Sequence, residues 1–76
     1  MSTNNTVNYK KLLNSKWTAL IPKNKEKHFQ VIKVNKNELD EQKVDSVIME
    51  AIFTNRKFLL DPNQLNDQNV WALGWL

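Results

Sequence analysis

The 76-residue chain contains no cysteine, and it has only one glycine, one histidine and one arginine. Without cysteine, disulfides and thiolate metal sites are excluded, which suits a reducing compartment. A single histidine, His28, excludes a zinc site built from several histidines. A glycine-rich phosphate-binding loop cannot form with Gly74 alone. We therefore expect neither a cofactor nor a metal ion.

Long apolar runs are also missing. The longest stretches, residues 47–49 and 51–53, are far shorter than the roughly 20 residues of a membrane-spanning helix. The first residues lack the basic segment and following apolar run that mark a signal peptide. We therefore expect a cytoplasmic protein without a membrane partner.

The three tryptophans are the most prominent apolar residues present. A chain this short buries only about 60–65% of its unfolded surface, so it depends on dense packing or on self-association. This favours a core position for Trp17, Trp71 and Trp75. Two of them fall in the last six residues, so we expect this segment to fold back over the open edge of a small sheet, with Gly74 allowing the turn.

Charge is distributed unevenly along the chain. Residues 1–36 carry a net charge of +7, and residues 37–76 carry −4. The two halves could neutralise each other across the fold, or the basic half could form a face for an acidic partner such as nucleic acid. Ten of the eleven basic residues are lysine, and the arginine that bidentate phosphate contacts favour occurs once.

Alternation of apolar and polar residues predicts short strands. Residues 1–8 are polar and without period, which predicts a disordered leader before a single domain at 9–76. After a short turn of helix ending near Asn14, strands are expected at 15–22 and 28–35, with Phe29, Val31 and Lys33 on one face of the second. Charged loops are expected at 23–27 and 36–43.

Residues 44–61 fit either a helical stripe or a strand hairpin. The hairpin is favoured because the 54–57 segment lies between two apolar runs and Asn55 tolerates the left-handed conformation of tight turns. Pro62 then opens a single helical turn with Leu65 facing inward. The expected fold is mainly β, a small antiparallel curled sheet or SH3-like barrel closed by the C-terminal segment; the alternative is α+β with 44–55 helical.

Two weak catalytic patterns are present. Glu26 and His28 could share a face and act as a general acid/base pair, but a surface loop and a strand-edge histidine are the favoured interpretation. The carboxylates of Glu38, Asp40 and Glu41 match no calcium-loop template and indicate a solvated loop. We therefore do not expect an enzyme.

Four strings resemble, in order, those of a family of small bacterial tryptophan-rich conserved hypothetical proteins. They are NSKWTA (14–19), KEKHFQV (25–31), MEAIFTNRKFLL (49–60) and LNDQNVWALGWL (65–76). The matching positions are Lys16, Trp17, Thr18, Lys27, His28, Phe29, Glu50, Thr54, Arg56, Leu65, Asp67, Trp71, Gly74 and Trp75. Members are richer in tryptophan, often with one shortly before the position of Leu65. The resemblance implies no activity.

The expected function is therefore a non-catalytic module that binds a protein partner through an aromatic-centred face. Arg56 is expected to pair with Asp67 and brace the C-terminal segment. The candidate binding residues are Lys16, Trp17, Lys27, His28, Phe29, Arg56, Trp71 and Trp75.

The alternative is binding of RNA or single-stranded DNA, with aromatic rings stacking on bases beside basic residues. The lysines that would serve it are Lys10, Lys11, Lys16, Lys23, Lys25 and Lys27. An exposed apolar face could also bind a second copy of the chain, so a homo-oligomer is a third possibility.

Overall fold

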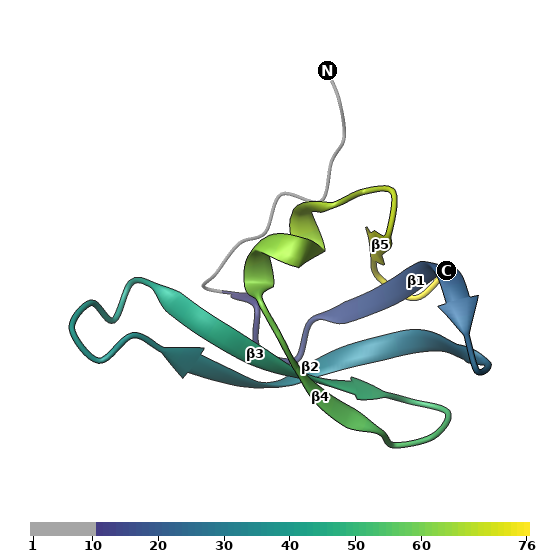
Figure 1. The fold of residues 1–76 in the computed structure, drawn as a ribbon, viewed down its shortest axis with the longest axis horizontal. Helices are drawn as coiled ribbons and strands as arrows, with labels where there is room; N and C mark the ends of the chain where they lie inside the picture. The colour runs from purple at the N-terminus through teal and green to yellow at the C-terminus, as the bar shows by residue number, and fades with distance from the viewer. Residues whose placement is uncertain (1–10) are drawn as a thin grey trace.

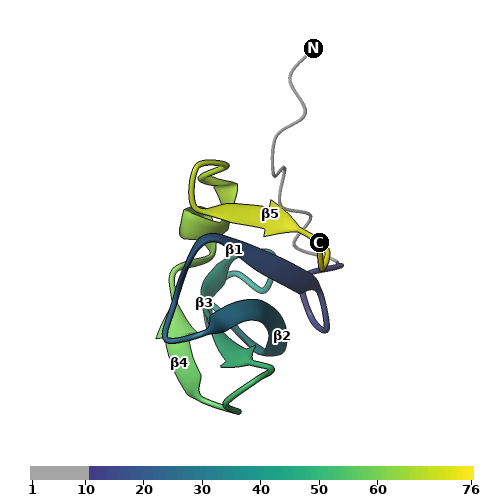
Figure 2. The same ribbon diagram turned by 90° about the vertical axis from the view of Figure 1, so that its right-hand side faces the viewer.

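The computed structural model describes residues 11–76, which form one open antiparallel sheet (Figure 1). Its strands are β1 (Lys16–Lys23), β2 (Glu26–Lys36), β3 (Val44–Ala51), β4 (Lys57–Leu60) and β5 (Trp71–Leu73), in the order β4-β3-β2-β1-β5. The prediction of a small, mainly β fold is confirmed. Seen end-on, the sheet curls without closing, with β4 and β5 at its edges (Figure 2).

A short 3-10 helix, η2 (Pro62–Asn66), connects β4 to the segment before β5. No helix among residues 11–76 has the length and hydropathy needed to cross a membrane. The predicted leader at 1–8 and Lys10 lie outside the described residues. Of the predicted first turn of helix, residues 11–14 are described, and Asn14 has a positive φ of 66°.

The ambiguous segment at 44–55 forms strand β3 and the following turn, so the helical alternative is wrong. Val47, Met49 and Ala51 alternate into the core and are fully buried. The strand is favoured because β3 pairs with both β2 and β4, so the backbone N–H and C=O groups of β3 are hydrogen-bonded within the sheet. One face of the strand is buried at the same time. Asn55 adopts the expected left-handed conformation, with a φ of 62°.

Strand β2 contains a bulge that the alternation pattern did not predict. Val31 pairs with Met49 and Lys33 with the adjacent Ile48, so Ile32 is the extra residue. A one-residue insertion reverses which face each later side chain occupies. Phe29 and Val31 share a face as expected, and both are buried. Lys33 is exposed instead of sharing their face, and Val34 packs against the core in its place.

The predicted loop at 23–27 is a tighter turn, and Glu26 already belongs to β2. Asn24 and Lys25 both have positive φ, 55° and 63°, which is the backbone of a type I′ hairpin turn. Pro22 lies inside β1 instead of ending it. Proline has no backbone N–H to donate to a neighbouring strand. Pro22 is tolerated because the β1–β2 register is irregular between Thr18 and Lys23, where the regular hydrogen-bond pattern is interrupted.

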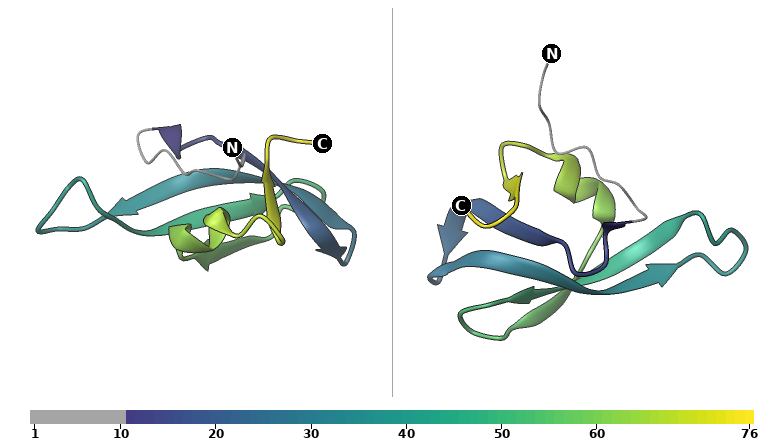
Figure 3. Two further views of the ribbon diagram at one scale, coloured as in Figure 1. Left: turned by 90° about the horizontal axis from the view of Figure 1, so that it is seen from above. Right: turned by 180° about the vertical axis from the view of Figure 1, so that it is seen from behind.

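The core lies between the concave face of the sheet and the segments that cross it, as Figure 3 shows for η2. Asp61 caps η2 by accepting a hydrogen bond from the Asn63 amide (2.9 Å), and this turn buries Leu65 as predicted. The Trp71 ring meets Phe29 edge-on, with ring centroids 5.0 Å apart. Leu12, from the start of the described chain, completes the cluster.

Candidate binding site

Residues 74–76 form a hook that turns away from β5 and back onto β1. Leu73 pairs with Trp17, and the Gly74 amide then donates to the Lys16 carbonyl (2.7 Å). Gly74 has a φ of +88°, a conformation that glycine adopts without a Cβ penalty. The predicted turn at this residue is confirmed.

The buried hydroxyl of Thr18 holds the hook in place. It donates to the Gly74 carbonyl (2.7 Å) and accepts from the Leu76 amide (3.0 Å). The Leu76 carbonyl lies 2.9 Å from Nε2 of His28 in β2. The last three residues are therefore held against β1 through Thr18 and against β2 through His28.

Trp75 lies on the surface, where 42% of it remains exposed, so its predicted place in the core is wrong. Because the chain reverses at Gly74, Trp75 does not follow Trp71 inward. Its indole N–H donates to the Phe29 carbonyl (2.9 Å). The His28 ring lies 5.9 Å away between centroids, and Nζ of Lys16 lies 4.8 Å from the ring centroid.

The β3–β4 turn is tied to the start of β2 by a buried carboxylate. Glu26, 5% exposed, accepts a hydrogen bond from the Thr54 hydroxyl. It also accepts from Arg56, through Nη2 (2.7 Å) and Nε (3.0 Å). Arg56 and then Thr54 lower the pKa of Glu26 below its ordinary value of 4.5, and Glu26 raises the pKa of Arg56.

This arrangement corrects two expectations. Arg56 pairs with Glu26 and not with Asp67, whose carboxylate instead accepts from the Asn69 amide (3.0 Å). Glu26 and His28 do not act on each other, since Glu26 binds Arg56 while His28 contacts the hook. Neither partner of Glu26 is near it in the sequence, so no local pattern pointed to the pair.

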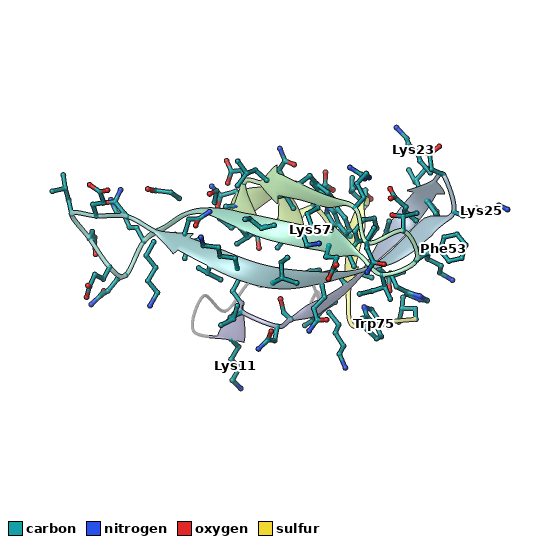
Figure 4. The ribbon with its side chains drawn as sticks, turned by 90° about the horizontal axis from the view of Figure 1, so that it is seen from below. Lys11, Lys23, Lys25, Phe53, Lys57 and Trp75 are labelled. Atoms are coloured by element: carbon teal, nitrogen blue, oxygen red, sulfur yellow. The ribbon has the colours of Figure 1, made fainter. Side chains whose placement is uncertain are left out.

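The same turn presents Phe53, which is 71% exposed. The Ile52 amide donates to the carbonyl of His28 in β2 (2.9 Å). The turn therefore begins beside His28, whose ring contacts Trp75. Figure 4 shows Phe53 and Trp75 at the same end of the molecule, together with Lys23 and Lys25. Phe53 lies two residues beyond Ala51, the last residue of β3, so it belongs to the turn and not to the buried face of the strand.

This end carries unpaired positive charge. Two carboxylate side chains near it are already bound, Glu26 by Arg56 and Glu50 by Lys57 (3.4 Å). None of the lysines described between residues 11 and 36 forms an ion pair. We call this surface the aromatic end and define it by six residues: Lys16, Lys23, Lys25, His28, Phe53 and Trp75.

The predicted binding residues divide into three groups. Lys16, His28 and Trp75 come together at the aromatic end. Trp17, Phe29 and Trp71 are buried, so their rings are not available to a partner; the Trp17 indole donates to the Ser15 hydroxyl (2.8 Å). Lys27 is exposed in β2 beside His28, and Arg56 is committed to Glu26.

Within residues 11–76, no group of three or more histidine or carboxylate side chains is placed to hold a metal ion. The carboxylates of Glu38, Asp40 and Glu41 lie in the exposed loop between β2 and β3.

A protein-family model described as "Tryptophan-rich protein (DUF2389)" matches residues 15–76. The match begins just before β1 and includes all five strands and the hook. It agrees with the tryptophan-rich family that the four sequence strings resemble. No curated protein and no solved structure matches the chain.

Proposed function

The chain belongs to the tryptophan-rich protein family DUF2389, and we propose that it is a non-catalytic interaction module that binds a protein partner through the aromatic end. The observation that carries this proposal is the state of Trp75. Its ring is exposed to solvent and yet held in one orientation by the hydrogen bond to Phe29 and by contacts with Lys16 and His28.

A fixed, exposed tryptophan is well suited to binding another protein. Tryptophan is enriched among the residues that dominate interface energies. A ring that is already ordered loses little conformational entropy when a partner covers it. The surrounding surface adds apolar area, because Phe53 and Leu76 are exposed by 71% and 69% and Ile52 by 38%.

Nucleic acid is the second candidate, favoured by the unpaired lysines at the same end. Stacking of bases needs an open ring face. The ammonium of Lys16 already lies over the Trp75 ring, and His28 packs at a tilt of 43° beside it. The one arginine of the chain is bound to Glu26. These contacts favour the protein partner over nucleic acid.

The test is affinity capture from native cell extract with the immobilised protein. A Phe53→Ala/Trp75→Ala double variant is compared with the wild type, and Leu59→Ala, an exposed apolar residue of β4 outside the aromatic end, is the matched control. We expect a specific protein to be retained by the wild type and the control, and reduced at least about tenfold by the double variant, as loss of an interface hot spot predicts.

Nuclease treatment and salt separate the two candidates. A captured protein that survives nuclease and moderate salt supports the proposal. Recovery of RNA or DNA that disappears on nuclease treatment, or that falls steeply between about 50 and 200 mM salt, would support nucleic acid instead. Capture unchanged in the double variant would show that the aromatic end is not the binding surface.

A further inference from the structure

The β2–β3 hairpin ends in a negatively charged loop, whereas the aromatic end is positively charged. Residues 37–42, here called the acidic loop, carry three carboxylates and no basic residue, with Lys36 and Lys43 at the base. At its tip, Leu39 is 98% exposed, the most exposed large apolar side chain of the described residues.

The acidic loop has a defined backbone. The Asn37 carboxamide oxygen accepts from the amides of Leu39 (2.8 Å) and Asp40 (3.0 Å). The Asn37 amide donates to the Lys43 carbonyl (2.9 Å), which closes the loop at its base. Leu39 is therefore presented between acidic neighbours on an ordered hairpin.

The acidic loop and the aromatic end lie at opposite ends of the molecule (Figures 1 and 4). The described chain extends 38 Å along its longest axis, so the two surfaces of one molecule cannot meet. Any contact between them has to join two molecules.

We propose that the acidic loop of one copy docks onto the aromatic end of a second copy. Leu39 would pack against Phe53 and Trp75, while the carboxylates of the loop approach Lys23 and Lys25, which have no ion-pair partner among residues 11–76. This inference deepens the proposed function, because it names a second copy as the partner of the same surface.

Such a contact is head-to-tail and therefore repeats. Each docked pair leaves one acidic loop and one aromatic end unoccupied, so the association continues into open chains or closes into rings. The contact is small and charged at its rim, which predicts weak binding that depends strongly on salt.

The first test is sedimentation equilibrium of the purified protein. At low salt we expect a weight-average mass that rises with concentration above the monomer value of 9.0 kDa. At about 1 M salt, where the Debye length is about 3 Å, the mass should return to the monomer value. A monomer at millimolar concentration in low salt would overturn the proposal.

The second test uses two variants that each block one surface. The loop variant carries Glu38→Lys, Leu39→Ser and Glu41→Lys, and the end variant carries Lys23→Glu and Lys25→Glu. Each should be monomeric alone. An equimolar mixture should form one-to-one dimers that grow no further, because the end variant supplies the loop and the loop variant supplies the aromatic end.

Lys11→Glu/Lys33→Glu is the matched control, with the same change of net charge at exposed lysines outside the aromatic end, and it should associate like the wild type. Circular dichroism and tryptophan fluorescence confirm that each variant is folded. A mixture that stays monomeric, or a single variant that still associates like the wild type, would overturn head-to-tail docking.

Failure of this inference is distinguishable from failure of the proposed function. If the purified protein stays monomeric while extract capture of a different protein depends on Phe53 and Trp75, docking between copies is wrong and the proposed function stands. If capped dimers form and the only protein captured from extract is the endogenous copy, docking stands and no separate protein partner is needed.

Discussion

Trp71 and Trp75 stand four residues apart in the same short segment, yet their surroundings differ completely. Trp71 is 8% exposed and packs on Phe29, whereas Trp75 is 42% exposed beyond the turn at Gly74. Composition favoured core positions for both. The turn at Gly74, which has a positive φ, directs the two side chains to different surroundings. A single glycine predicts that the chain can turn, but it does not predict the direction of the turn.

The two tryptophans should therefore differ in their effect on stability. Trp71→Ala should lower the free energy of unfolding by about 3–5 kcal/mol, which is most of the roughly 4–8 kcal/mol expected for a domain of this size. Trp75→Ala should cost about 1–2 kcal/mol, since it loses a partly buried ring and one hydrogen bond. Urea unfolding monitored by circular dichroism measures both, and equal losses would contradict this division.

Glu26 should make stability depend on pH in the acidic range. Its pKa is lowered in the folded protein because Arg56, and then Thr54, donate to the carboxylate. The ionised form therefore stabilises the fold above the ordinary value of 4.5, and this contribution is lost as the pH falls through the lowered pKa. The pKa of Arg56 is raised from an already high value, so Arg56 stays charged throughout.

Urea midpoints of the wild type and Glu26→Gln, measured from pH 7 to about pH 3, test this expectation. The wild type should have the higher midpoint at neutral pH, and the difference should shrink as the carboxylate is protonated. Glu41→Gln, in the acidic loop, is the matched control. A difference between wild type and Glu26→Gln that is constant with pH would exclude the ion pair as its cause.

At the scale of elements, strands were predictable where apolar residues alternate against a single buried face. The alternation of Val47, Met49 and Ala51, together with a left-handed Asn55, was enough to favour the hairpin over the helix. The bulge at Ile32 was not predictable, because isoleucine is as common in regular strands as it is at an inserted position. The short β1–β2 turn was missed because lysine is an unusual residue at positive φ.

That turn offers a direct test. Lys25 has a φ of 63°, a conformation that strains most side chains by about 1–2 kcal/mol. Glycine removes the strain but adds about 0.5–1 kcal/mol of unfolded-state entropy. Lys25→Gly should therefore stabilise the protein by about 0.5–1 kcal/mol. Thermal unfolding of Lys25→Gly and Lys25→Ala measures this, and an equal melting temperature for the two would refute the strain.

At the scale of the whole molecule, the candidate site depends on contacts that no local pattern encodes. Lys16, His28 and Trp75 come from β1, β2 and the hook, and Phe53 from a turn held by Glu26. Lys16, His28 and Trp75 were predicted as binding residues from the sequence, but Trp75 was also expected in the core. The missing information was how distant segments meet, which a single sequence does not contain.

The acidic loop projects beyond the core and should be dispensable for folding. Replacing residues 38–42 with Asn-Gly leaves Asn37 and Lys43 hydrogen-bonded across a standard two-residue hairpin turn. The free energy of unfolding should change by no more than about 0.5 kcal/mol, as for surface changes outside the core. Chemical denaturation checks this. A much larger loss would mean that the loop supports the body of the fold.

Strand β1 pairs with β2 across a two-residue turn, and with β5 through Thr18 and Ala72, near the two ends of the described chain. Closing that much longer loop costs about 2 kcal/mol more in chain entropy. The neighbouring pairs β1–β2–β3–β4 should therefore form the folding nucleus, and β5 should join after the rate-limiting step. In chevron plots, Val47→Ala should slow folding, while Trp71→Phe should mainly accelerate unfolding. Changes in the closing strand would then shorten the lifetime of the folded protein without delaying its formation.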